Sequence, residues 1–497
     1  MKKKLREILK GVEIKSESGR TNPDIAGVTT DSKELKESFV FIAVKGNHYD
    51  GHNFIKEAIE KGASVIVSQE DFVNAENTKD ITRILVSDSR QASADIIHNF
   101  YGRPADAMKM VGITGTNGKT TVSYLVEGIF KKAGFNVGVI GTVNYRYNSR
   151  QIPATNTTPG ALQLVKMLSY MAANNANYAV MEVSSHSLQQ SRVRCIDFKI
   201  AAFTNVTPEH LDYHKDMEAY KDAKALLFEG LSRDSTAVLN IDDDFGRELS
   251  GRTPAKVLKY SLLKNADITA ENISFSPTAS RMLINTPKGK MKLRTLLVGR
   301  FNIYNILASI GVGIAEGVPL DEIIWGIESV TVVPGRLEEV FCGQPFKVYV
   351  DYAHTDDALK NILTSLRDLK PKHIITLFGC GGDRDITKRP RMGRVANLLS
   401  DYVVITTDNP RSEDPAAIAE QITEGIEKDS LKRVFVALDR RQAIKKAIGL
   451  AGKGDIVLLA GKGHETYQVF KNMVQPFDDR ECAKKILADL GYAPCLA

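Results

Sequence analysis

The segment from Gly112 to Thr121, which reads GITGTNGKTT, constrains the fold and function of this chain more than any other stretch. Glycine at positions 115 and 118 lets the backbone N–H groups turn around phosphate oxygens, and Lys119 can reach terminal phosphates. Thr120 can offer its hydroxyl to Mg²⁺. The segment therefore predicts a phosphate-binding loop, with nucleotide-binding residues Gly115, Thr116, Asn117, Gly118, Lys119, Thr120 and Thr121.

The flanks of this loop fit the same interpretation. An apolar run from Met108 to Ile113 enters the turn, and apolar residues then recur at helical spacing until Gly134, so a bound anion would lie at a helix N-terminus. Ile113 stands where the standard P-loop pattern has its first glycine. The alternative is an ordinary glycine turn between a strand and a helix.

The composition is that of a globular protein, and a length of 497 residues is enough for about three domains. The 66 basic and 60 acidic residues are spread along it, so nucleic-acid binding is not indicated. No apolar run forms a signal-peptide core or a membrane span, so we expect no membrane insertion. The five cysteines form no Cys-x-x-Cys pair, which predicts free thiols and a cytoplasmic protein.

Strand-like and helix-like segments alternate along the chain, which predicts an α/β protein with three domains. Residues 1–107 read as a small α/β domain and residues 108–333 as a parallel sheet covered on both faces by helices. Residues 334–497 form a third α/β region, in which apolar strands lead into polar turns at residues 351–354, 379–384, 408–411 and 461–465. Ligands bind beyond the carboxyl ends of such strands, so we expect these turns to meet at one cleft.

Two residues at predicted strand ends are candidates for the metal and the catalytic water. Glu182 closes an apolar strand, and His210 follows the next one. A carboxylate and an imidazole beside a phosphate loop can bind Mg²⁺ or hold a water molecule, although a lone residue of either type is as often a capped or solvated one. Ser184 is equally compatible with a helix cap. From its pattern alone, Lys224 reads as a surface lysine of a helix.

Arginine-rich turns in the third region indicate an anionic second substrate, because a guanidinium binds carboxylate or phosphate with two parallel hydrogen bonds. Arg391 and Arg394 lead into a predicted helix and are more simply interpreted as a solvated basic surface. Arg389 and Arg411 are the stronger candidates for recognition, whereas the arginine at position 384 belongs to the same cluster without an assigned role.

These motifs together resemble the Mur ligase family over nearly the whole chain, and among its members those that add diaminopimelate. The phosphate loop at 115–120 has that family's shorter form. The resemblance implies a uridine-nucleotide-binding N-terminal domain, a central P-loop ATPase-like domain and a C-terminal Rossmann-like domain that binds an amino acid. The other segments that carry it lie at residues 156–158, 182–186, 190–192, 210–214, 302, 336, 351–354 and 461–465.

The resemblance also implies roles for individual residues. It makes Lys224 a carbamylated lysine that helps bind a second Mg²⁺, so that the catalytic set is Lys119, Glu182, His210 and Lys224 and the metal-binding set is Thr120, Glu182, His210 and Lys224. ATP would also contact Asn302, Arg336, Asp351 and His354. UDP-N-acetylmuramoyl-L-alanyl-D-glutamate would bind Ser32, Asn47, His48, Tyr49, Asn156, Thr157, Thr158, Ser184, Gln190 and Arg192, and meso-diaminopimelate would bind Arg389, Asp408, Asn409, Pro410, Arg411, Gly461 and Glu465.

The implied reaction is ATP-driven amide-bond formation through an acyl phosphate, in a monomer whose third domain closes over the nucleotide. The chain departs from the family pattern at Asp356, where a proline is usual, and at Glu209, where an aspartate is common. Arg411 favours diaminopimelate over L-lysine, because only diaminopimelate carries a second carboxylate. The alternatives are the same ligase adding L-lysine, a folylpolyglutamate synthase-like ligase, a P-loop kinase and a non-catalytic nucleotide-binding regulator.

Overall fold

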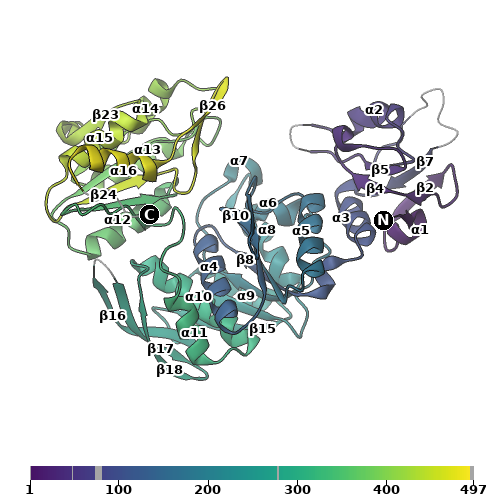
Figure 1. Ribbon diagram of the computed structural model, residues 1–497, viewed down its shortest axis with the longest axis horizontal. Helices are drawn as coiled ribbons and strands as arrows, with labels where there is room; N and C mark the ends of the chain where they lie inside the picture. Colours follow the sequence, from purple (N-terminus) through teal and green to yellow (C-terminus); the bar gives the residue numbers. More distant parts are fainter. Residues whose placement is uncertain (1, 47–48, 73–80, 277–278, 493–497) are drawn as a thin grey trace.

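The computed structural model describes residues 2–46, 49–72, 81–276 and 279–492, and three sheets with their helices lie one after another along the molecule (Figure 1). The N-terminal sheet is at the right of Figure 1, the central sheet in the middle and the C-terminal sheet at the upper left. The α/β class and the three-part architecture predicted from the sequence are confirmed. The domain boundaries expected at 107/108 and 333/334 stay a prediction, and both fall between one sheet and the next.

The N-terminal sheet has the strand order β2-β7-β6-β5-β4 and is parallel except for its edge strand β2. Small apolar clusters on both faces form its core, with Val40, Ile42 and Val65 on one side and Phe41 and Ile66 on the other. Its elements are β1 (Lys3–Lys4), α1 (Leu5–Ile8), β2 (Ile14–Ser18), β3 (Asp24–Ile25), β4 (Gly27–Thr29), β5 (Phe39–Ile42), α2 (Ile55–Glu60), β6 (Val65–Ser68), β7 (Thr82–Val86) and α3 (Ser89–Phe100).

The central sheet has eleven strands in the described part of the chain, in the order β11-β10-β9-β12-β8-β13-β14-β15-β16-β17-β18. Strands β9 to β16 of this order run parallel, and antiparallel strands close both edges. The strands are β8 (Lys109–Thr114), β9 (Val137–Ile140), β10 (Asn144–Tyr147), β11 (Arg150–Pro153), β12 (Tyr178–Glu182), β13 (Phe198–Phe203), β14 (Thr236–Asn240), β15 (Lys256–Ser261), β16 (Ile268–Ser276), β17 (Ala279–Thr286) and β18 (Gly289–Thr295).

Helices cover both faces of the central sheet, as expected for parallel strands that are apolar on both sides. One core lies between the sheet and helices α4, α10 and α11, and a second lies on the face covered by α5, α8 and α9. The helices are α4 (Lys119–Lys132), α5 (Ala161–Ala173), α6 (Ser185–Gln189), α7 (Leu211–His214), α8 (Met217–Glu229), α9 (Asp244–Arg252), α10 (Arg300–Glu316) and α11 (Leu320–Glu328).

The C-terminal sheet has the order β19-β20-β24-β21-β22-β23, and all its pairs are parallel except β19 with β20. A separate hairpin, β25–β26, follows the last strand of the sheet. The elements are β19 (Glu338–Glu339), β20 (Lys347–Asp351), α12 (Asp356–Asp368), β21 (Ile374–Phe378), α13 (Lys388–Leu399), β22 (Tyr402–Ile405), α14 (Pro415–Thr423), β23 (Val434–Val436), α15 (Arg440–Leu450), β24 (Ile456–Ala460), β25 (Tyr467–Phe470), β26 (Met473–Pro476) and α16 (Asp479–Asp489).

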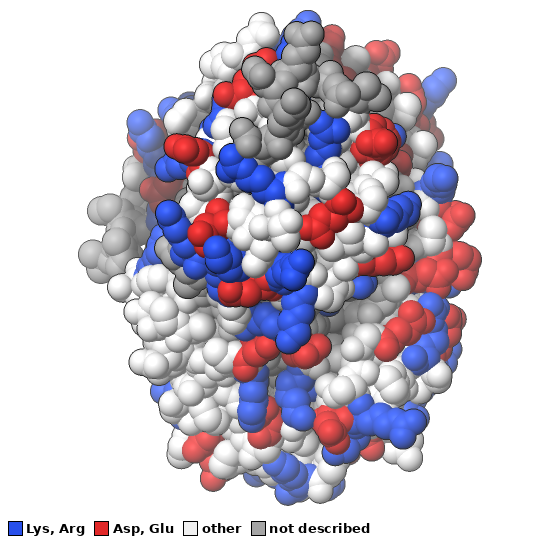
Figure 2. All heavy atoms as spheres, turned by 90° about the vertical axis from the view of Figure 1, so that its right-hand side faces the viewer, with Lys and Arg blue, Asp and Glu red and all other residues white. Residues whose placement is uncertain are grey.

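Surface charge, the length and polarity of the helices, and the state of the cysteines each bear on the sequence-based expectations. Basic and acidic side chains are interspersed over the N-terminal end of the molecule (Figure 2). No helix in the described ranges is long and apolar enough to cross a membrane. Cys195, Cys380 and Cys482 carry free thiols, whereas Cys342 is disulfide-bonded, which the expectation of free thiols did not include.

Candidate functional site

The loop between β8 and α4 is shaped by glycine. Gly115 and Gly118 have φ angles of +145° and +92°, which L side chains rarely adopt. A Cβ atom at Gly115 would collide with Thr204 Oγ1, and one at Gly118 would collide with Asn305 Oδ1. The loop is therefore a cradle of backbone N–H groups at the start of α4, which is suited to phosphate oxygens.

Lys119 lies across this loop. Its Nζ donates to the carbonyl oxygens of Gly115 at 2.6 Å and Thr116 at 2.8 Å. Burial lowers the pKa of the Lys119 ammonium, while the carboxylates of Glu209 and Glu182 act in the opposite direction. An arriving phosphate oxygen can replace these carbonyls as the acceptor, so Lys119 is held at the place where the loop predicts it to act.

Glu182 is the centre of the hydrogen-bond network beside the loop. Its carboxylate accepts from Thr120 Oγ1 at 3.0 Å, from the Thr142 N–H at 2.9 Å and from Thr142 Oγ1 at 2.8 Å. Arg336 Nη2, from the C-terminal region, lies 3.1 Å from Thr120 Oγ1. The oxygen atoms of a hydroxyl and a carboxylate beside a phosphate loop are suitable ligands for Mg²⁺.

His210 belongs to a cluster of imidazoles that differ in exposure, because its own side chain is 45% exposed, His186 is half-buried and His214 is buried. Its ring lies edge-on to that of His186 with centroids 4.7 Å apart, and His214 is 5.4 Å from His186. Burial lowers the pKa of His210 and lowers those of His186 to about 3 and His214 to about 4. The rings are therefore neutral at physiological pH, which is the form that binds metal ions.

Lys224 is not the surface lysine that its sequence pattern predicted. It lies on the inward face of α8 with Tyr220 and is only 1% exposed. Its Nζ sits 4.3 Å from the centroid of the Tyr220 ring. Burial lowers the pKa of the Lys224 ammonium well below its usual value, and the charge of Lys119 lowers it further. The neutral amine that results is a nucleophile toward CO₂.

A cavity of about 400 Å³ opens beside the phosphate loop and is lined from both the central and C-terminal regions. Arg336, Asp351 and His354 line it as predicted. Burial raises the pKa of Asp351, whose carboxylate nevertheless accepts the N–H groups of Leu337 and Ala353.

Asn302 lies beneath this cavity instead of lining it. Its side chain donates to Val298 O, just before α10, at 2.8 Å and accepts from Asn305, within α10, at 3.1 Å. Asn305, one helical turn further, lines the cavity together with Phe301 and Tyr304. The contact of Asn302 with ATP stays a prediction, and Asn305 is the asparagine of α10 that lines the cavity.

A larger cavity of about 620 Å³ lies between the N-terminal and central regions. Gln190 and Arg192 line it, and Arg192 bonds both Gln190 Oε1 and the carbonyl of Thr158. Ser32 lies outside its wall, because its hydroxyl bonds Glu57 at 3.0 Å. Tyr49 is 78% exposed, and predicted residues Asn47 and His48 lie outside the described residues.

The remaining predicted peptide-binding residues form a chain that leads from this cavity to the phosphate loop. Thr158 Oγ1 donates to the carbonyl of Glu182 at 2.7 Å and accepts from the Ser184 N–H at 3.0 Å. Thr157 Oγ1 lies 3.1 Å from that of Thr142. Asn156 is exposed, and its carbonyl accepts from Tyr145. Ser184 also caps α6, which confirms the helix-cap interpretation, and its role in substrate binding stays a prediction.

The turns of the C-terminal sheet meet at a third cavity of about 260 Å³. The lining includes Asp408, Asn409, Arg411, Gly461 and Glu465 from the predicted turns, and Glu209 and His210 from the central region. Arg411 has a left-handed backbone with φ of +53°, and its Nη1 donates to Gly382 O at 2.6 Å. Pro410, between two lining residues, contributes its carbonyl to the N–H of Glu413.

Arg389 does not reach this cavity. Its guanidinium is fully buried and bonds the Glu413 carboxylate at 2.8 and 2.9 Å, with a further bond to Gln421 at 2.6 Å. Arg384 and Arg391 line the cavity instead. The assignment of Arg389 to the amino-acid pocket is therefore corrected to Arg384, and Arg391 is not the purely solvated residue that its position predicted.

Other residues of the site carried only weak sequence signals. Thr142 follows strand β9 by two residues, so its place at a strand end was the available signal. His186 and His214 stand within the predicted segments but had no role assigned. Tyr304 and Asn305 repeat at helical spacing from Phe301 along α10, which sequence alone does not distinguish from a core face.

Known proteins resemble this chain over its whole length. Family models match it as the Mur ligase family catalytic domain over residues 24–101, the Mur ligase middle domain over 113–313 and the Mur ligase glutamate ligase domain over 335–463. The UDP-N-acetylmuramoyl-L-alanyl-D-glutamate–2,6-diaminopimelate ligase of Clostridium tetani is 42% identical over 489 residues, which covers 98% of this chain and 100% of that protein.

Solved structures share the fold. One structure of a UDP-N-acetylmuramoyl-L-alanyl-D-glutamate–2,6-diaminopimelate ligase matches with a TM-score of 0.69 at 30% identity, covering 99% of this chain and 100% of that one. The MurF ligase from Thermotoga maritima in complex with ADP matches with a TM-score of 0.62 at 20% identity, covering 88% and 94% of the two chains.

Proposed function

Because the chain belongs to the Mur ligase family, we propose that it is an ATP-dependent, ADP-forming ligase that adds meso-diaminopimelate to UDP-N-acetylmuramoyl-L-alanyl-D-glutamate. The product would be a tripeptide precursor of peptidoglycan. Relatives at 42% identity and full coverage carry the name of this activity, and a solved structure with that name shares the whole fold.

One observation supports this function most directly: the phosphate loop lines the nucleotide cavity, and hydrogen bonds or shared walls link that cavity to the two others. The cavity lined by Gln190 and Arg192 is connected to Glu182 through Thr158. The two other cavities share Tyr352 and His354 in their walls. This arrangement supports a site for three substrates, a carboxylate acceptor, a nucleotide and an amine donor, which a ligase of this kind must bring together.

The proposed chemistry has two steps. An oxygen of the D-glutamate side-chain carboxylate attacks the γ-phosphorus of ATP. The bond from that phosphorus to the bridging oxygen breaks, ADP is released, and an acyl phosphate is formed. The amine of diaminopimelate then attacks the acyl carbon, loses a proton and expels phosphate as the amide forms. The chain's part is to position the reactants and to balance charge, with Lys119 at the phosphates.

Magnesium fits this site. Thr120, Glu182 and His210 supply a hydroxyl, a carboxylate and a neutral imidazole, and carbamylation of the neutral Lys224 amine by CO₂ would add a further anionic group. The ion, when bound, would neutralise charge between the phosphates. Asp351 and Arg336 hold the C-terminal wall of the nucleotide cavity.

The third cavity fits a substrate with two amino-acid heads. Arg384 and Arg411 offer guanidinium groups for a carboxylate, and Glu465 offers an acceptor for an ammonium group. Asp408, Asn409, Pro410 and Gly461 form the turns that carry these groups. L-Lysine lacks the carboxylate that the arginines would bind, so the pocket favours diaminopimelate.

The test is phosphate release from ATP in the presence of UDP-N-acetylmuramoyl-L-alanyl-D-glutamate, with meso-diaminopimelate or L-lysine added in parallel. Release with diaminopimelate alone is expected. Release with lysine alone would overturn the assignment of the amino acid, and release with neither would overturn the ligase. Hydroxylamine should trap the acyl phosphate as a hydroxamate, whereas the product of a hydroxyl kinase would survive it.

A further inference from the structure

The turns after β22 and β24 both contribute to the amino-acid cavity, but they are not neighbours in the sheet. Strand β21 lies between β22 and β24, so the two turns leave the sheet roughly 10 Å apart, twice the usual strand spacing. Asp408, Asn409 and Arg411 stand on one turn, and Gly461 and Glu465 stand on the other. The shape of the cavity therefore depends on what fixes this separation.

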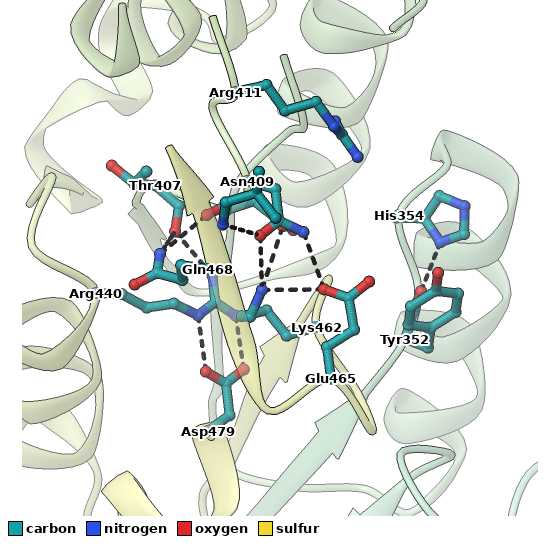
Figure 3. A network of polar contacts seen from close by, with 12 residues as sticks. Tyr352, His354, Thr407, Asn409, Arg411, Arg440, Lys462, Glu465, Gln468 and Asp479 are labelled. Atoms are coloured by element: carbon teal, nitrogen blue, oxygen red, sulfur yellow. Dashed lines mark hydrogen bonds and ion pairs between the residues drawn. The ribbon is translucent and has the colours of Figure 1, made fainter. Parts of the chain in front are cut away.

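A buried arginine connects the two turns from below (Figure 3). Arg440, the first residue of α15, donates from Nη1 to the carbonyl of Thr407 at 3.3 Å and from Nη2 to the carbonyl of Ala460 at 3.1 Å. Thr407 directly precedes the first turn, and Ala460 directly precedes the second. One guanidinium thus bridges the bases of both turns.

Asp479 fixes the orientation of that guanidinium. Its carboxylate, at the start of α16, accepts from Arg440 Nε at 2.7 Å and from Nη2 at 2.6 Å, and both side chains are fully buried. A two-pronged pair of this kind holds the guanidinium plane in one direction. The remaining N–H groups are consequently aimed at the two carbonyls.

A second layer transmits this arrangement to the cavity. Lys462 Nζ, completely buried, donates to Asn409 Oδ1 at 3.1 Å and to Glu465 Oε2 at 3.0 Å, and Asn409 Nδ2 donates to the same Glu465 oxygen at 2.9 Å. Gln468 Nε2 also bonds the carbonyls of Thr407 and Asp408. The side chains at the mouth are thereby joined to the braced backbone (Figure 3).

We propose that Arg440, oriented by Asp479, is a positioning residue for the amino-acid substrate, because it sets the distance between the 408–411 and 461–465 turns. Arg440 does not line the cavity, so it acts through Asn409 and Glu465. The inference rests on the proposed function only for the identity of the amino acid. It concerns binding of that substrate and leaves the nucleotide and uridine-linked substrates unaffected.

The test is Arg440→Lys in the full-length enzyme, since a lysine ammonium can pair with Asp479 but cannot span both carbonyls. We expect the KM for meso-diaminopimelate to rise about tenfold, the factor expected for one charge-assisted hydrogen bond. The KM values for ATP and for UDP-N-acetylmuramoyl-L-alanyl-D-glutamate should stay within about twofold. Equal changes in all three KM values, or no change in any, would overturn the proposal.

Arg367→Lys is the matched control. Arg367 also pairs with an aspartate, Asp401, at 2.8 Å and donates to a carbonyl, that of Leu399, at 3.0 Å, but it does so at the opposite end of β22. We expect its KM for diaminopimelate to be unchanged. A rise equal to that of Arg440→Lys would show a general loss of stability and overturn the proposal.

Asp479→Asn provides a second measurement if Arg440→Lys does not fold. It keeps the guanidinium and the size of its partner but weakens the orientation, so the same selective rise in KM is expected at smaller amplitude. An unchanged KM in a folded Asp479→Asn variant would overturn the proposal. A wild-type enzyme that releases no phosphate with diaminopimelate would instead contradict the proposed function.

Discussion

Two buried lysines, one in the central domain and one in the C-terminal domain, have opposite surroundings. Lys462 is completely buried, and its ammonium contacts Glu465, Asn409 and, at 3.8 Å, the Asp408 carboxylate. Lys224 is 1% exposed and rests on the face of Tyr220, with no hydrogen bond or ion pair found from its Nζ in the described part of the chain. Burial is therefore similar, and the partners differ.

The difference separates a structural lysine from a reactive one. The acceptors around the Lys462 amine join it to its neighbours by hydrogen bonds and hold them in place. A buried ammonium without acceptors loses its proton, as the lowered pKa of Lys224 indicates. The comparison teaches that burial alone does not distinguish the two lysines, whereas the presence or absence of acceptors around the amine does.

The largest effect is expected at Lys119, a half-buried amine that bonds the loop carbonyls of Gly115 and Thr116. Lys119→Ala should lower phosphate release by about 10³-fold or more, because phosphoryl transfer depends on charge placed at the phosphates. Thermal unfolding should be nearly unchanged. Lys131→Ala, at the exposed end of the same helix, is the control. Near-normal turnover of Lys119→Ala would contradict the assigned role.

The second prediction concerns the pH dependence of stability caused by His98, a buried residue that is not among the predicted substrate-binding residues. His98 is fully buried with both ring nitrogens unpaired, and burial lowers its pKa to about 4. The unfolded chain takes up a proton near pH 6.5 and the folded one near 4, so stability is complete above pH 6.5 and falls as the pH drops. The loss in the free energy of unfolding reaches about 3 kcal/mol, because each unit of pKa difference between the folded and unfolded states is worth about 1.36 kcal/mol.

His98→Phe should therefore flatten the dependence of the urea unfolding midpoint on pH between 6.5 and 4. Phosphate release at pH 7.5 should stay near that of the wild type. A variant whose midpoint falls as steeply as the wild type over this range would show that another group causes the acid sensitivity.

The third prediction concerns Lys224 itself. Lys224→Ala should reduce turnover by about 10²-fold, the size typical of one electrostatic group in an active site, with little change in unfolding temperature. Short carboxylates such as acetate should restore part of the activity by supplying the missing anion. Lys221→Ala, on the same helix but bonded at the surface to Glu218, is the control. Full activity without Lys224 would remove it from the catalytic set.

The fourth prediction concerns Lys462, the other buried lysine of the comparison. Lys462→Met leaves Glu465 without its cationic partner, so we expect the KM for diaminopimelate to rise about tenfold and stability to fall by about 2 kcal/mol. The KM for ATP should not change. The exposed Lys484, paired with Glu481, gives the control Lys484→Met. A loss of turnover at saturating diaminopimelate would place Lys462 in the chemistry and break the comparison.

The smallest effect is expected at Asp356, where related sequences usually have proline. Asp356 is the first residue of α12, after the N-cap Thr355, and this is the helical position that accepts proline best. Asp356→Pro should change stability by less than about 1 kcal/mol and leave turnover within about twofold. Asp357→Pro, one residue on, serves as the comparison. A severe loss in Asp356→Pro would mean that its ion pair with Arg391 matters.

Much of the fold was predictable from the sequence because the parallel strands are continuous apolar runs. The apolar run from Met108 to Ile113 coincides with β8 to within one residue at each end. The phosphate loop was predictable because its glycine and lysine positions have a local geometric cause. The residues that line the walls of the cavities were predictable only in part.

The residues whose positions differed from the predictions share a physical reason: their surroundings are set by contacts with residues far away in the sequence. Arg384 and Arg389 stand in one arginine-rich segment, and the partners that hold Arg389 inside, Glu413 and Gln421, come from other parts of the chain. Asn302 and Asn305 lie on one helix, and their difference is which face meets the nucleotide cavity. Lys224 looked like a surface lysine because helical spacing does not show which polar side chain is turned inward.

The wall shared by Tyr352 and His354 has a thermodynamic consequence. The nucleotide cavity takes one side from the loop at 117–121 and the other from residues 336–368, so a nucleotide bound there contacts two domains at once. Whatever free energy such a ligand adds to their association must equal the gain in its own affinity when they are associated. Nucleotide binding and association of the two domains would then strengthen each other by one common factor, and a substitution that removes the nucleotide's contacts with one domain would reduce that factor for both.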